Sequence, residues 1–99
     1  MLETKFGPMA RDGDFVLVVD FNYMKRKCDT YMARVYRSKA YTGVRIPGTA
    51  NYVHKMKAEC VIPENYVPPE VKRKIYEDMA IHNRDTIEYD MERGILWER

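Results

Sequence analysis

The sequence predicts a mostly β protein, in which a small antiparallel barrel of four to five strands is followed by a C-terminal helical segment. Two observations indicate this class. Short apolar runs rich in β-branched and aromatic residues alternate with Gly, Pro and Asp turn residues over the first two thirds of the chain. A charged run with apolar residues at helical spacing then follows a double proline. We therefore expect residues 1–67 to form the barrel and residues 68–99 to form a helical tail.

Turn signals separate the segments that have the composition of strands. Asp12-Gly13 precedes a β-branched and aromatic run that is apolar almost throughout, which predicts a largely buried strand. A later segment ends at Pro47-Gly48, a dipeptide typical of turns. Two further segments alternate apolar with polar residues, as a half-buried antiparallel strand does. In chain order the expected strands are residues 14–21, 30–38, 41–46 and 51–62, and the polar residues 22–29 are expected to form a loop or an exposed hairpin end.

The expected tail begins with an amphipathic helix. Pro68-Pro69 opens it, because a proline in the first turn of a helix lacks an N–H that would have no partner there. Val71, Ile75 and Met79 then follow at a spacing of four residues on one stripe. This stripe is expected to face the barrel.

A second helical pattern follows. Asp85, with Glu88 three residues later, resembles a capping box and predicts a short helix that runs to Arg93 and ends at Gly94. The apolar residues 95–97 are expected to fold back onto the body of the protein.

Composition and charge limit the class of partner. The chain has 99 residues, 45% hydrophobic and 32% charged, and no apolar run reaches the roughly 18 residues that a membrane helix needs. Its net charge of +2 is too small to bind nucleic acid by bulk electrostatics. The N-terminus carries Glu3 and no apolar stretch, unlike an export signal. We therefore expect a cytoplasmic location, no membrane partner, and reduced thiols at Cys28 and Cys60.

No pattern of catalytic or metal-binding residues stands out. His54, His82, Cys28 and Cys60 are the soft metal ligands, and no two of them have zinc-site spacing. His54 lies on an alternating segment, which is typical of a core or interface histidine, and His82 lies near a helix C-terminus, where it interacts favourably with the dipole. The sequence contains no glycine-rich phosphate-binding motif. We therefore expect a non-enzymatic protein that has no cofactor.

Three stretches resemble the Src homology 3 (SH3) family. VIPENYV, residues 61–67, resembles the family's Pro-x-Asn-Tyr-Val motif, in which a buried strand leads through a 3₁₀ turn to a last strand. GDFVLV and TYMARV, residues 13–18 and 30–35, are similar to two earlier strands of that family. The resemblance implies an SH3-like barrel, with Pro63 and Tyr66 at the positions that line a groove for Pro-rich peptides.

The chain departs from the family around that groove. Thr30 and Tyr31 occupy the positions of the family's paired tryptophans, and Cys60 occupies that of a glycine. The family's first strand and acidic loop are absent or much shortened, and an insertion separates Arg34 from Val61. We therefore do not expect a working groove for Pro-rich peptides. The motif tyrosine is expected to be a partly buried structural residue.

A basic, tyrosine-rich stretch carries the functional hypotheses. Residues 23–45 interleave seven basic residues with four tyrosines. Tyr and Arg are enriched at protein interfaces, which favours a protein-binding module that acts as a small adaptor or inhibitor of a macromolecular partner. Rings also stack on bases and cations bind phosphates, so RNA or single-stranded DNA is the alternative ligand. The candidate partner-binding residues are Tyr31, Arg34, Tyr36, Arg37, Tyr41, Arg45, Tyr52 and Tyr66.

Small, charge-rich chains of this kind resemble bacteriophage accessory proteins that bind host machinery, which is an analogy of composition. The apolar residues of the C-terminal tail also offer a surface for homo-oligomer formation.

Overall fold

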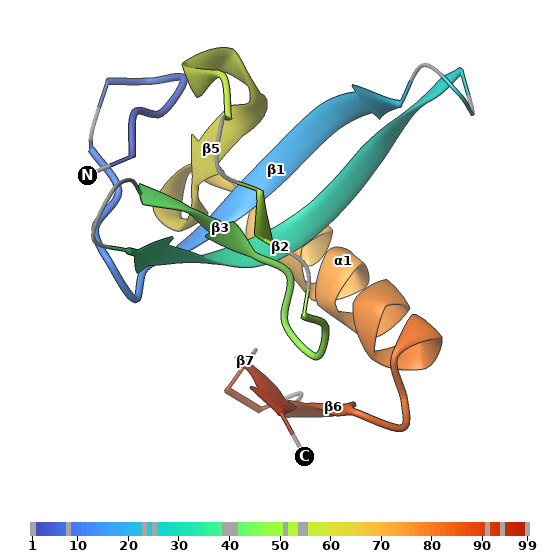
Figure 1. Ribbon diagram of the computed structural model, residues 1–99. Helices are drawn as coiled ribbons and strands as arrows, with labels where there is room; N and C mark the ends of the chain where they lie inside the picture. Colours follow the sequence, from blue (N-terminus) through green and yellow to red (C-terminus); the bar gives the residue numbers. More distant parts are fainter. Residues whose placement is uncertain are drawn as a thin grey trace.

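The computed structural model describes residues 2–7, 9–22, 24, 26–38, 42–50, 52–53, 56–90, 92–93 and 95–98, with only the backbone of Asn22 (Figure 1). These residues form a five-stranded antiparallel sheet of order β4-β3-β2-β1-β5, one helix, and a separate two-stranded hairpin. The elements are β1 (Phe15–Asn22), β2 (Lys27–Arg37), β3 (Thr42–Arg45), β4 (Tyr52–Val53), the 3₁₀ turn η1 (Ala58–Cys60), β5 (Val61–Pro63), the 3₁₀ turn η2 (Glu64–Tyr66), α1 (Pro69–His82), β6 (Ile87–Asp90) and β7 (Ile95–Glu98). Within the described residues, no helix is both long enough and apolar enough to cross a bilayer.

Strands β1 and β2 form a long hairpin at the centre of the sheet. Both strands were predicted, and the inner part of β1, at Val16, Leu17 and Val18, is buried on both faces as its continuous apolar composition requires. On one face, Val16, Val18, Ala33 and Val35 pack under the N-terminal segment. The main chain of that segment is tied to the sheet edge by the Lys5 N–H, which donates to the Val61 carbonyl at 2.8 Å.

The opposite face of β1 and β2 is covered by α1 and by the β6–β7 hairpin. Leu17 and Met32 lie opposite each other in the sheet and pack with Tyr76, Ile87 and Leu96, all of which are buried. Figure 1 shows α1 and the hairpin together on this side of the sheet. The prediction that residues 95–97 fold back onto the body is thus confirmed for Leu96, while Trp97 remains 46% exposed.

The helix was predicted correctly at its start and less well in its buried face. It begins at Pro69 and ends at His82, where the N–H and side-chain amide of Asn83 both donate to the Met79 carbonyl. Met79 is buried, but Val71 of the expected stripe is 45% exposed, and Tyr76 is the second buried residue of the helix. The buried face is therefore rotated toward Tyr76.

The sheet does not close into the expected barrel, and the helix lies in mid-chain rather than in a C-terminal tail. The 3₁₀ turn η2 does follow β5. Pro68 and Pro69 then lack the N–H groups that a barrel-closing strand would donate, so the chain continues as α1. Strands β4 and β5 consequently remain at the two edges of the sheet.

The long strand expected over residues 51–62 is also wrong. Tyr52 and Val53 pair with Arg45 and Val44 of β3, but β3 has only four residues, so it cannot pair with a strand as long as residues 51–62. The later part of the segment turns through η1, and β5 pairs with β1 instead. The prediction for His54 lies outside the described residues.

The expected second helix is replaced by the β6–β7 hairpin. Ile87 and Tyr89 are β-branched and aromatic residues that favour strands, and they point toward the core under α1. The Asp90 carboxylate closes the turn by accepting the N–H groups of Glu92 and Arg93, each at 3.1 Å. Burial of this alternating face outweighs the local capping signal at Asp85. The predicted stop at Gly94 lies outside the described residues.

We predict that Gly48→Ala destabilises the protein by about 2–4 kcal/mol. Gly48 has φ +75°, and an added Cβ would overlap the Ile87 side chain of the hairpin, so left-handed strain and overpacking add. Gly13→Ala is the matched control, because Gly13 has φ +90° but open space around its Cβ position. In urea unfolding, Gly13→Ala should lower the free energy of unfolding by only the cost of left-handed backbone strain, about 1–2 kcal/mol. Equal losses for the two variants would show that the hairpin is not packed against Gly48.

Candidate arginine–tyrosine interface

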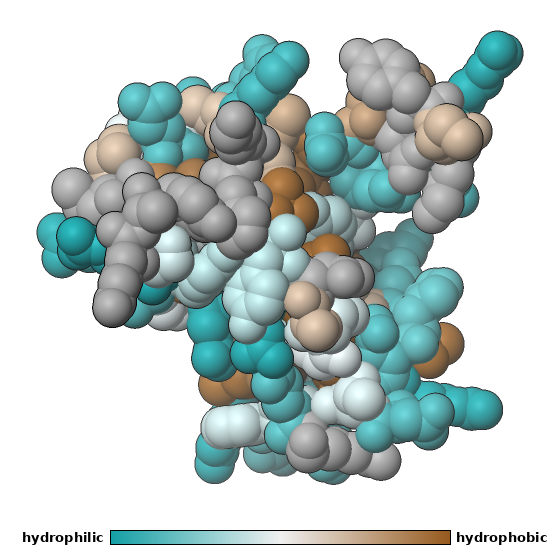
Figure 2. All heavy atoms as spheres, in the orientation of Figure 1, coloured by the Kyte–Doolittle hydropathy of each residue, from teal (hydrophilic) through white to brown (hydrophobic). Residues whose placement is uncertain are grey.

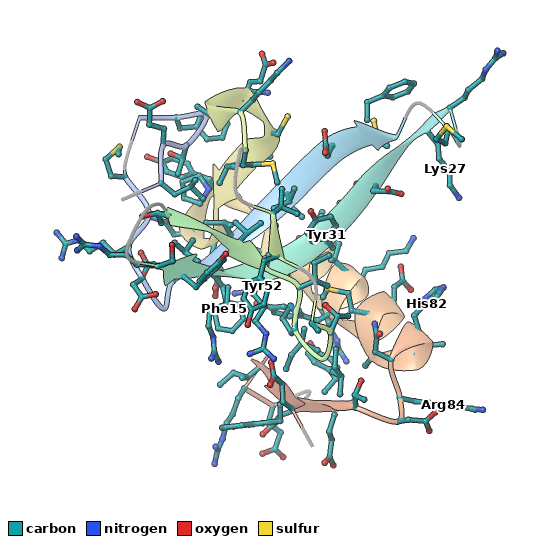
Figure 3. All side chains as sticks on the ribbon, in the orientation of Figure 1. Phe15, Lys27, Tyr31, Tyr52, His82 and Arg84 are labelled. Atoms are coloured by element: carbon teal, nitrogen blue, oxygen red, sulfur yellow. The ribbon has the colours of Figure 1, made fainter. Side chains whose placement is uncertain are left out.

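Four side chains form a straight row across the sheet. Strand register places Phe15, Arg34, Arg45 and Tyr52 directly opposite one another on β1, β2, β3 and β4. Directly opposed residues share one face of a sheet, and this face is the one that α1 and the hairpin cover farther along. The row therefore lies where the covered core ends. Figure 3 labels its two ends, Phe15 and Tyr52.

Each arginine of the row lies over an aromatic ring. The Arg34 guanidinium carbon is 5.5 Å from the centre of the Phe15 ring, and that of Arg45 is 5.8 Å from the centre of the Tyr52 ring. Tyr36, two residues along β2 from Arg34, packs edge-on against Tyr52 with 4.5 Å between ring centres. We call Arg34, Tyr36, Arg45 and Tyr52 the arginine–tyrosine face.

The arginine–tyrosine face surrounds an open depression of about 370 Å³, to which Asp12 and Gly13 also contribute. Arg34 is exposed, Tyr52 is 46% exposed, and Tyr36 and Arg45 are half-buried. Arginine and aromatic side chains that already pack against each other lose little freedom when they bind a partner. On the side of the molecule seen in Figure 2, apolar patches are small and separated by hydrophilic residues.

The two arginines differ in their partners. Arg45 forms an ion pair with Glu98 of β7 at 3.4 Å, and its Nε donates to the Thr49 carbonyl at 3.3 Å. Among the described residues, no carboxylate lies within ion-pair distance of Arg34. Two guanidinium groups directly opposite each other on neighbouring strands repel, so an anionic group placed between them would be stabilised.

The other predicted residues do not join this face. Arg37 follows Tyr36 on β2 and so points to the opposite side of the sheet, while its N–H donates to Asp12 Oδ1 at 2.9 Å. Tyr31 is half-buried between the two cores. Tyr66, on η2, packs on Phe6 with 5.0 Å between ring centres and is 50% exposed. Tyr41 lies outside the described residues.

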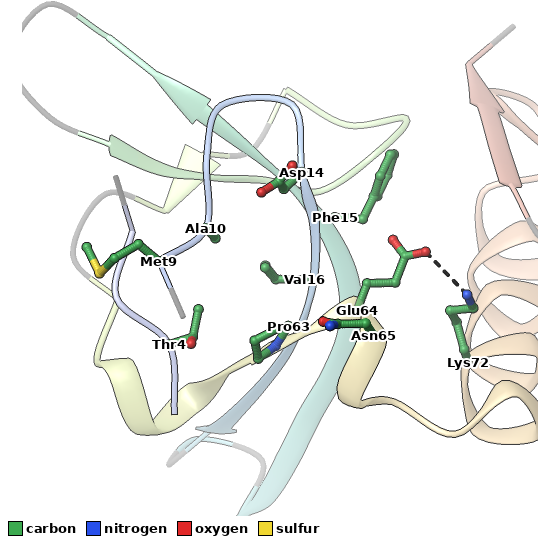
Figure 4. Close-up of a pocket in the computed structure, with 10 residues that line it drawn as sticks. All are labelled: Thr4, Met9, Ala10, Asp14, Phe15, Val16, Pro63, Glu64, Asn65 and Lys72. Carbon is green, nitrogen blue, oxygen red and sulfur yellow. Dashed lines mark hydrogen bonds and ion pairs between the residues drawn. The ribbon is translucent and has the colours of Figure 1, made fainter. Parts of the chain in front are cut away.

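A second hollow, of about 460 Å³, lies between the N-terminal segment and the end of β5 (Figure 4). Met9, Val16 and Pro63 line it, and an ion pair of 3.2 Å between Glu64 and Lys72 lies at its side. Tyr66 is not among the lining residues. The two residues that the SH3 resemblance assigned to one groove therefore do not share this hollow.

The metal-binding residue types do not cluster. Among the described residues, no three His, Cys, Asp or Glu side chains come together as a metal site requires. Cys28 and Cys60 are free thiols, and burial raises the pKa of Cys60, as do Asp20 and Glu59. His82 Nδ1 lies 2.8 Å from the Asp78 carbonyl one turn earlier, as expected for a residue that caps the end of α1.

Sequence reasoning missed Phe15, Asp12 and Glu98, which shape the interface. Phe15 was assigned to the core, and only the register of β1 with β2 shows that it lies beside Arg34. Glu98 reaches Arg45 because it lies on β7, which pairs with β6, where the sequence predicted a second helix. No local pattern in the sequence indicates either contact.

No protein-family model, curated protein or solved structure matches the chain.

We predict that Tyr31 makes stability fall between pH 10 and pH 12. Burial, with smaller contributions from Asp20 and Asp29, raises the pKa of Tyr31 from 10.0 to about 12. The folded protein thus holds this proton more tightly than the unfolded chain, so the stabilisation is complete below pH 10 and is lost as pH rises to 12.

The test is urea unfolding of wild type and Tyr31→Phe across this pH range. The variant should lose less stability than wild type, since Tyr76, whose pKa is also raised by burial, is present in both proteins. Parallel pH profiles would contradict the placement of Tyr31.

Proposed function

We propose that the chain is a non-enzymatic protein-binding module, an adaptor or inhibitor, whose arginine–tyrosine face binds an acidic segment of a partner protein. The observation that carries this proposal is the pair of opposed guanidinium groups of Arg34 and Arg45, each stacked on a ring. A carboxylate placed between them would accept charge-assisted hydrogen bonds from both. Tyr36 and Tyr52 would supply the flanking apolar contact that interface tyrosines commonly provide.

Nucleic acid is the alternative ligand, because the same guanidinium groups and rings suit phosphates and bases. The spatial distribution of the basic residues favours protein. Arg34 and Arg45 share one face, Arg37 points to the other side of the sheet, and Arg26 and Lys27 lie at the far end of the β1–β2 hairpin. A nucleic-acid groove would bring such residues into one continuous track.

We retain the SH3 resemblance as a proposal about origin. It is supported by β5 leading through Pro63 into the single 3₁₀ turn η2, and by the antiparallel pairing of β1 with β2 and of β2 with β3. An open relative of that barrel would have exchanged its last strand for α1. The bacteriophage analogy adds that the partner belongs to a bacterial host and that the protein acts in its cytoplasm.

The test is affinity capture from a bacterial lysate with the tagged protein, with and without nuclease. We expect one specific protein to survive nuclease treatment, and we expect its affinity to fall about 30-fold or more in Tyr36→Ala, the loss typical of a central interface tyrosine. Arg34→Ala should weaken binding about tenfold through loss of a charge-assisted contact.

Lys74 is an exposed residue of α1, so Lys74→Ala is the matched control and should bind the partner as wild type does. Material that disappears with nuclease, with affinity that falls steeply as salt rises, would support nucleic acid instead. Equal binding by wild type and Tyr36→Ala would exclude this face as the interface.

A further inference from the structure

The outer half of the β1–β2 hairpin, residues 19–22 of β1 and 27–30 of β2, extends beyond the rest of the sheet, and we call it the arm. Strand β5 pairs only with Val16–Val18 of β1, and β3 pairs only with Arg34–Arg37 of β2. In Figure 1 the arm projects to the upper right, and in Figure 2 a notch separates it from the body. Both long edges of the arm therefore lack a neighbouring strand among the described residues.

The open edge of β2 presents unpaired backbone groups. Successive residues of an antiparallel strand direct their N–H and C=O groups to alternate sides. The Met32 N–H points away from β1, because it donates to the Met79 thioether sulfur at 3.2 Å. Thr30 and Cys28 therefore point the same way, and in the part of the chain that the structure describes no strand reaches them, because β3 ends before Pro47. An open edge of this kind pairs readily with another strand.

The arm also carries charges that a second copy can complement. Asp20 and Asp29 lie directly opposite each other on one face. Lys27, two residues from Asp29, shares that face and is exposed. Among the described residues, no carboxylate lies within ion-pair distance of Lys27. On the opposite face, Phe21 lies across from Cys28 and is 45% exposed.

We propose that the arm pairs edge to edge with the arm of a second copy of this chain. The two β2 strands run antiparallel, with Cys28 of each copy directly opposite Cys28 of the other. In this register, Lys27 of each copy lies directly opposite Asp29 of the other copy. Lys27, which has no carboxylate within ion-pair distance among the described residues of its own copy, thereby gains one. On the opposite face, the two Phe21 and two Cys28 side chains form one apolar row.

Charge selects this register over its neighbours. Shifting the centre of symmetry to Asp29 would keep Cys28 and Thr30 hydrogen-bonded to each other, but it would place the two Asp29 carboxylates against each other and Lys27 opposite Tyr31. The arrangement is also closed, because the two-fold axis uses the same edge of both copies. The inference does not depend on the proposed function, since the arginine–tyrosine face lies at the other end of β2.

The first test is the mass in solution measured by sedimentation equilibrium. Wild type should approach twice the chain mass of 11.8 kDa as concentration rises. Cys28→Pro removes the N–H at the centre of the joint, and proline is tolerated at an edge position whose N–H faces outward. This variant should stay monomeric with an unchanged circular dichroism spectrum, while the matched control Cys28→Val should dimerise. A wild type that is monomeric at every concentration, or a Cys28→Pro variant that dimerises like wild type, would overturn the proposal.

The second test examines the register. Lys27→Glu should weaken the dimer about tenfold, because two ion pairs become repulsive, and Lys27→Glu/Asp29→Lys should restore it. Directly paired residues have Cα atoms about 5.5 Å apart, so a short bismaleimide should link two copies through Cys28. Cys60→Ser should still be linked and Cys28→Ser should not. Linkage through Cys60, or no rescue in the double variant, would refute this register.

Discussion

The constraint on which the structure depends is the need to cover β1 on both faces. Phe15 to Val19 are apolar without interruption, so neither face of this strand can be left in water without losing a large part of the folding free energy. One face is closed by Leu2 and Ala10 of the N-terminal segment. The other is closed by α1 and the C-terminal hairpin, which supply Tyr76, Met79, Ile87 and Leu96. This division explains why the sheet remains open and is covered on both faces by other parts of the chain.

The surfaces with functional potential lie where this cover ends. At one end of β2, the face that buries Met32 continues into Arg34 and Tyr36, and Glu98 of the hairpin holds Arg45 beside them. The position of the arginine–tyrosine face thus depends on a hairpin that is distant in sequence. At the other end of β2, β3 no longer pairs with the strand, and the arm is left with an open edge. The two proposed interactions use these two ends independently.

The parts of the fold that were predicted from sequence are those with strong local signals. The apolar run of β1, the alternation of β2 and the prolines before α1 each specify an element without help from the rest of the chain. Local sequence patterns gave the wrong element where contacts with distant parts of the chain determine the secondary structure. The capping box at Asp85 resembles the start of a helix, but the segment forms a hairpin because this buries Ile87 and Leu96 under α1. Alternation after residue 51 predicted one long strand, but β3 is too short to pair with it.

The arginine–tyrosine face could likewise be predicted only in part from local sequence. Sequence identified Arg34, Tyr36, Arg45 and Tyr52 by residue type, but it grouped them with Arg37 and Tyr66, which the structure places elsewhere. Strand alternation separates Tyr36 from Arg37, and strand register brings Arg45 to Arg34. Register depends on pairing between distant segments, so no pattern within residues 23–45 could have supplied it.

The most direct test of this account is amide hydrogen exchange measured residue by residue. If α1 and the β6–β7 hairpin are the obligatory cover of β1, the hydrogen-bonded amides of the hairpin should exchange with nearly the same free energy of opening as those at the centre of β1 and β2. If the hairpin amides exchange much faster while β1 stays protected, the hairpin is a separate appendage. The account of the core, and of how Glu98 positions Arg45, would then be wrong.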